Sequence, residues 1–155
     1  MSMLRQLLAL AIVLVAAPVA AEPVVAAAQE NRGTEEERSE IARILEADNL
    51  DAGSLTPREV ASQIAAIPRG RAPEDFWSAY QEHVRAWRLA AEAQAKLEDL
   101  ADGKRGGSEQ VMAEADEALS AIETTFSEVE RIAASYGVPM PTPPALIENF
   151  DPDTV

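Results

Sequence analysis

Residues 73–102 have the sequence PEDFWSAYQEHVRAWRLAAEAQAKLEDLAD, in which no helix breaker follows the opening proline. Apolar and small residues recur there at alternating steps of three and four, the spacing that places side chains on one face of a helix. This stripe comprises Phe76, Tyr80, His83, Trp87, Ala90, Gln94, Leu97 and Ala101. The pattern predicts a long helix over about 73–102, which Gly103 ends.

A second stripe with the same spacing begins after the short segment GKRGG, residues 103–107. It comprises Met112, Ala115, Leu119, Ile122, Phe126, Val129, Ala133 and Tyr136. We expect a helix over about 108–136 that Ser108 caps and that folds back on the first as an antiparallel hairpin. A turn centred on Arg105 pairs residues whose numbers sum to about 210, which puts Trp87 and Ile122 at the centre of the core.

Two shorter helices are predicted before this hairpin, over about 35–48 and 57–67. Thr34 with Glu37, and Thr56 with Glu59, have the spacing of capping boxes, and Pro57 suits a first helical position. A hairpin alone would leave part of its apolar surface exposed to solvent, so we expect the two short helices to cover the aromatic end of the hairpin. The sequence predicts an all-α fold, a small coiled-coil-like helical bundle, as a monomeric four-helix arrangement or as a homodimer of hairpins.

The N-terminus has the pattern of a secretory signal peptide. Arg5 precedes an apolar run from Leu7 to Ala17, and small residues end at Ala21, after which we expect cleavage. Retention as a membrane anchor is the alternative, but the uncharged run is shorter than the roughly 20 residues of a spanning helix. The expected organisation is a signal peptide over 1–21, a flexible leader over 22–33 and a helical domain over 34–137. The expected location is periplasmic or secreted, without a membrane span after cleavage.

Residues 138–155 are predicted to form an extended, disordered tail, because five of them are prolines. Its apolar residues Leu146, Ile147 and Phe150 either dock on the bundle or await a partner. The final residues Asp153, Thr154 and Val155 fit the kind of peptide end that PDZ-type domains bind by adding it to a sheet edge. They are therefore candidate partner-binding residues.

Composition excludes several function classes. The chain has 27 acidic against 13 basic residues and a net charge of −14, which disfavours nucleic acids and anionic lipid surfaces as partners. It has no cysteine and one histidine, so thiolate and multi-histidine metal centres are excluded. We expect no metal and no cofactor.

His83 is the main candidate for a ligand-binding or acid–base residue, because histidine titrates near neutral pH and this one lies in an aromatic stretch. It is either a hydrogen-bonded core histidine or, with Tyr80, Trp87 and Phe126, part of a ligand-binding cavity. A haem site lacks its second axial ligand, since Met112 lies about 20 Å from His83 in the predicted register.

These features favour a non-enzymatic, exported, acidic helical protein that acts through protein contacts, as an adaptor, inhibitor or envelope-stress factor. Its expected partner is another envelope protein. The alternative is a small-ligand carrier with an aromatic cavity near His83. A closed aromatic core favours the first function, and a hollow that reaches His83 favours the second.

Overall fold

The computed structural model describes residues 32–104 and 106–143, which contain four helices and no strand. The helices are α2 (Glu35–Asp48), α3 (Pro57–Ala65), α4 (Glu74–Ala101) and α5 (Ser108–Ser135). The predicted all-α class and the four predicted helices are confirmed. No helix in this part of the chain is long and apolar enough to cross a membrane. The expected signal peptide, nearly all of the leader and the end of the tail lie outside the described residues.

The two short helices begin with the predicted caps. The Thr34 side chain accepts from the Glu37 amide while the Glu37 carboxylate accepts from the Thr34 amide, and Thr56 and Glu59 repeat the arrangement. The long helix α5 begins differently, because Gly107 is its N-cap with a φ of 82° and Ser108 is its first helical residue. The prediction that Ser108 caps this helix was therefore wrong.

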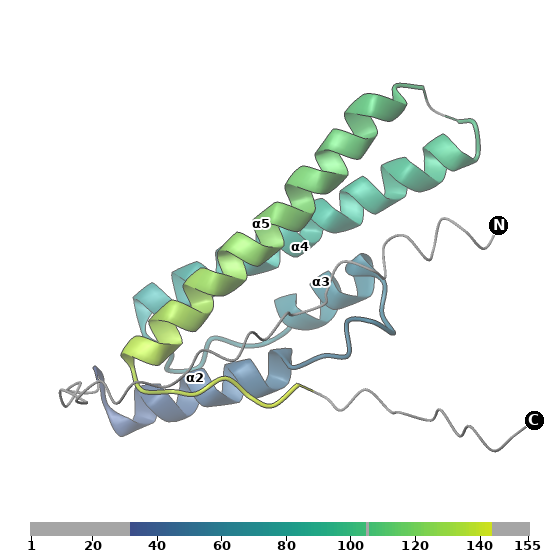
Figure 1. Cartoon of the computed structure of the whole chain (residues 1–155). Coiled ribbons are helices and arrows are strands. Elements are labelled where there is room, and N and C mark those ends of the chain that lie inside the picture. The colour runs from purple at the N-terminus through teal and green to yellow at the C-terminus, as the bar shows by residue number, and fades with distance from the viewer. Residues whose placement is uncertain (1–31, 105, 144–155) are drawn as a thin grey trace, which may run out of the picture. The chain divides into compact units, whose positions relative to one another are not determined.

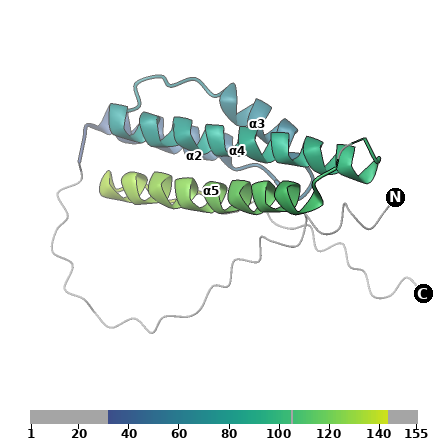
Figure 2. The same cartoon turned by 90° about the horizontal axis from the view of Figure 1, so that it is seen from above.

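Helices α4 and α5 form the predicted antiparallel hairpin, which Figures 1 and 2 show side by side along most of their length. Three polar contacts between the helices fix its register. The Lys96 ammonium pairs with Glu114, His83 Nδ1 lies 3.1 Å from Thr125 Oγ1, and the Tyr136 hydroxyl donates to Asp75. These contacts agree with the predicted sum of about 210.

One large hydrophobic core lies at the end of the hairpin where α4 begins and α5 ends, alongside α2 and α3 (Figure 1). Its largest fully buried side chains are those of Ile41, Ile44 and Leu45 of α2, Ile64 of α3, Phe76, Tyr80 and Val84 of α4, and Val129 of α5. The short helices thus cover the aromatic end, as predicted. A smaller cluster of Ala90, Ala93, Ala115 and Ala118 fills the hairpin toward its turn.

The predicted centre of the core was wrong, because Trp87 and Ile122 are only half-buried. The buried face also leaves the predicted stripe toward the turn, where Met112 is 54% exposed and Val111 is buried. The cause is geometric. An α-helix with 3.6 residues per turn drifts by about 20° per heptad from a strict seven-residue repeat. A stripe that is correct at Val129 therefore rotates out of the interface over the roughly two and a half heptads back to Met112.

The chain after α5 is docked as far as the structure describes it. Gly137 has a φ of 75° and reverses the chain, and the Val138 amide donates to the carbonyl of Ala133. Val138 is buried, Met140 packs against the large core, and the Asn49 side-chain amide donates to the carbonyl of Thr142 at 2.7 Å. Residues 138–143 are thus extended, as predicted, but they are ordered against the bundle, which corrects the expectation of disorder for this part of the tail.

Candidate functional site

His83 lies in a hydrogen-bonded chain that joins α4 to α5. Trp87 Nε1 donates to His83 Nε2 at 3.1 Å, so this ring nitrogen must be the unprotonated one. The proton therefore sits on Nδ1, which faces the hydroxyl of Thr125, and Thr125 in turn donates to the carbonyl of Ala121 at 2.7 Å. Every polar atom of the imidazole is used within the fold.

The surroundings of His83 keep it neutral. The residue is 3% exposed, and burial lowers its pKa to about 4. Protonation of Nε2 would also place two N–H donors face to face, because Trp87 already donates to that atom. This geometry is that of a structural histidine that orders the contact between α4 and α5.

Two of the predicted ligand-binding residues, Trp87 and Phe126, pack against His83, whereas Tyr80 stacks on Phe76 and Trp77. The Phe126 ring lies 5.4 Å from the His83 ring, Trp87 meets the imidazole edge-on at 6.4 Å, and Tyr80 is fully buried. None of these four side chains lines the hollow described below. The other predicted set, Asp153, Thr154 and Val155, lies outside the described residues.

Asp48 is a perturbed group that the sequence analysis missed. It is the last residue of α2, and burial raises its pKa to about 7, with a smaller opposing effect from a hydrogen bond with the Tyr80 hydroxyl. That hydroxyl also lies 3.3 Å from the carbonyl of Ile64. A protonated Asp48 can donate to Tyr80 while Tyr80 donates to Ile64, so the protonated form completes the network. An acid at the negative end of a predicted helix was the available signal.

Most basic side chains in the described residues form ion pairs. The nine pairs are Arg32–Asp75, Arg38–Glu35, Arg43–Glu40, Arg69–Glu74, Arg71–Glu36, Arg85–Glu82, Lys96–Glu114, Lys104–Asp102 and Arg131–Glu128. Within this part of the chain only Arg58 and Arg88 have no acidic partner, and both are exposed. In a chain with twice as many acids as bases, two described arginines that form no ion pair stand out.

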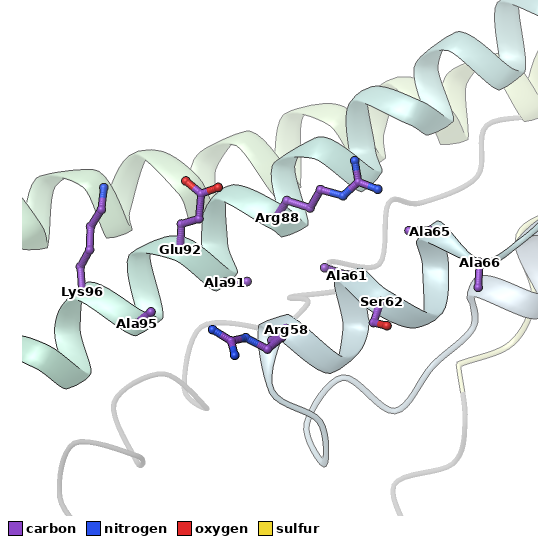
Figure 3. Close-up of a pocket in the computed structure, with 10 residues that line it drawn as sticks. All are labelled: Arg58, Ala61, Ser62, Ala65, Ala66, Arg88, Ala91, Glu92, Ala95 and Lys96. Atoms are coloured by element: carbon purple, nitrogen blue, oxygen red, sulfur yellow. The ribbon is translucent and has the colours of Figure 1, made fainter.

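Both of these arginines line the same surface hollow, which lies between α3 and α4 (Figure 3). The hollow is open to solvent and has a volume of about 800 Å³. Small side chains from both helices, Ala61 and Ala65 on α3 and Ala91 and Ala95 on α4, form much of its lining, and Figure 3 shows Arg58 extending from α3 and Arg88 from α4. Two further charged residues of α4 line it, Glu92 and Lys96, and Lys96 pairs with Glu114. The hollow therefore combines an apolar lining with a net positive charge, and its two arginines have no acidic partner in the described residues.

Arg58 occupies a position that is unfavourable for a cation. It is the second residue of α3, where unpaired amide groups make the helix end positive. Neither the pairing of acids and bases nor the dipole of α3 explains an arginine here. Sequence reasoning missed both arginines because their meeting depends on how α3 packs against α4, which no local pattern specifies.

No protein-family model, curated protein or solved structure matches this chain.

Proposed function

We propose that this chain is an exported, non-enzymatic helical protein of the periplasm or the extracellular space, which acts by binding another envelope protein. Adaptor, inhibitor and envelope-stress roles all fall within this proposal. The N-terminal sequence pattern with Arg5, the apolar run and Ala21 supports export. The observation that carries the binding role is the hollow between α3 and α4, with Arg58 and Arg88 unpaired beside it.

Several properties of this hollow suit protein recognition. Arginine is enriched at protein interfaces, because its guanidinium makes several directed hydrogen bonds and its stem packs on apolar surface. The alanines let a partner segment approach the backbones of both helices closely. By contrast, His83 has its hydrogen bonds within the fold and is buried, so the hollow is the better-placed surface for recognition.

Site-specific crosslinking in the envelope of the source organism tests the binding role. A photoreactive side chain replaces Ser62, which lines the hollow, and in a matched control it replaces Ser127, an exposed serine on α5. We expect a discrete protein adduct from position 62 that disappears when Arg58→Glu and Arg88→Glu are combined. Unchanged thermal unfolding of the double variant controls for misfolding. Equal adducts from both positions, or none from position 62, would overturn the proposal.

The export part has its own test. Sequencing the N-terminus of protein purified from the periplasmic or secreted fraction should find Glu22 as the first residue. Full-length protein in the membrane fraction would instead show that the segment is retained as an anchor.

A further inference from the structure

We propose that the hollow between α3 and α4 binds the acidic segment that follows Pro143 in this same chain. The inference rests on the proposed function and deepens it, because the segment would then compete with the partner for one surface. Displacement of the segment would be the step that lets the partner bind.

The charges of the segment complement those of the hollow. Residues 144–155 contain three acids, Glu148, Asp151 and Asp153, and no lysine, arginine or histidine. Three basic side chains, Arg58, Arg88 and Lys96, and one acid, Glu92, line the hollow, so its lining is positive overall. Arg58 and Arg88 have no acidic partner in the described residues. A carboxylate that binds a guanidinium at such a site forms a charge-assisted and often bidentate hydrogen bond.

The apolar residues of the segment also have a place to bind. Phe150 stands next to Asp151, so a carboxylate held at an arginine brings an aromatic ring to the alanine lining formed by Ala61, Ala65, Ala91 and Ala95. Burial of the ring there would remove apolar surface of both partners from water.

The attachment point of the segment gives it the required reach. The hydrogen bond from Asn49 to the carbonyl of Thr142 holds two parts of the chain together. Arg58 is nine residues after Asn49, and Asp151 is nine residues after Thr142. The stretch that leads to the arginine and the stretch that leads to the acid therefore contain the same number of residues. The path from Asn49 to Arg58 contains turns and the first turn of α3, so it spans less than the roughly 30 Å of nine extended residues. Asp151 can therefore reach Arg58.

Tethering raises the occupancy of such a site. A segment attached by a short linker samples its site at an effective concentration in the millimolar range, so weak contacts suffice to hold it. The two ion pairs lie at the surface, and salt should therefore weaken the docking.

Disulfide trapping in the full-length chain tests this inference, because the chain has no cysteine of its own. One variant combines Ser62→Cys with Asn149→Cys, and the matched control combines Ser127→Cys with Asn149→Cys. We expect the first pair to close within one chain at least about tenfold faster than the control, as two surface charge pairs would provide. Adding Arg58→Glu and Arg88→Glu, or raising the salt concentration, should reduce the rate to that of the control.

Each other result overturns the inference. Equal rates for the two cysteine pairs would mean that the segment does not prefer the hollow, and disulfide-linked dimers would show that a second copy provides the occupant. Insensitivity to the arginine substitutions would show that charge does not hold the segment. The proposed function fails separately, since it depends on the adduct formed from position 62 and not on the disulfide.

Discussion

The two ends of the α4–α5 hairpin share one helical geometry but differ in what they bury. At the covered end, where α4 begins and α5 ends and where α2 and α3 pack on the hairpin, Phe76, Tyr80 and Val129 are fully buried. Toward the turn, the buried residues are Val111 and four alanines, with Leu97 and Ile122 partly buried beside the alanines. Because hydrophobic stabilisation follows the apolar area removed from water, the covered end should provide most of the stability. Helical periodicity alone therefore does not show where a hairpin is stable.

Truncation of Phe76 should have the largest effect on this comparison. Phe76→Ala removes a fully buried ring and leaves a cavity in the large core, so we expect a loss of about 3 to 5 kcal/mol in the free energy of unfolding. Leu97→Ala removes a partly buried side chain near the turn and should lower the free energy of unfolding by about 1 kcal/mol. Urea unfolding measures both. Equal losses would show that the two ends contribute alike.

Trp87 lies where the two ends meet and should have the next largest effect. The residue is half-buried and packs against the large core, and it also donates to His83. Trp87→Ala should therefore cost about 2 to 3 kcal/mol, less than a fully buried aromatic residue. Trp87→Phe keeps most of the packing but removes the N–H group that donates to His83, so its loss of stability measures the contribution of the hydrogen bond. A loss of stability larger than that of Phe76→Ala would support the sequence-based prediction that the core is centred on Trp87.

The difference between the ends also marks what the sequence predicts and what it does not. Capping at Thr34 and Thr56 depends on residues three apart, and the hairpin register follows from a five-residue turn, so both were predictable. The exposure of Met112 was not, because a small angular drift becomes visible only after several heptads. The site at Arg58 and Arg88 depends on the packing of α3 on α4, for which the sequence carries no local signal.

Asp48 adds a pH dependence to the covered end. Its folded pKa of about 7 is above its ordinary value of 3.8, so the folded state binds the proton more tightly and stability falls as the pH rises from about 4 to about 7. Asp48→Asn removes this effect and should be more stable than the natural protein at pH 8 by about 1 to 3 kcal/mol. The gain should vanish near pH 4. Thermal unfolding across this range measures it, with the exposed Asp51→Asn as control; a gain that is independent of pH would exclude the titration.

His83, which lies between the two ends of the hairpin, should give stability a pH dependence of the opposite sign to that of Asp48. Its folded pKa of about 4 is below its ordinary value of 6.5, so the unfolded chain binds the proton more tightly and stability falls from pH 7 toward pH 4. In the Asp48→Asn background, His83→Gln should remove about 1 to 2 kcal/mol of this acid loss. Glutamine can still donate to Thr125 and accept from Trp87. Parallel stability curves with and without His83→Gln would show that this imidazole does not titrate during unfolding.

The smallest expected effect is at the turn end, where the Lys96 ammonium lies 2.6 Å from the Glu114 carboxylate. Both side chains are about one third exposed, so water screens the attraction and the pair should contribute less than about 1 kcal/mol. A double-mutant cycle of Lys96→Ala and Glu114→Ala isolates the coupling energy, which should shrink further in 0.5 M salt. Glu114 also accepts from Gln110, so the single substitution of Glu114 overstates the pair. A coupling energy that rivals the loss from Phe76→Ala would mean that charge, and not apolar burial, holds the uncovered end of the hairpin together.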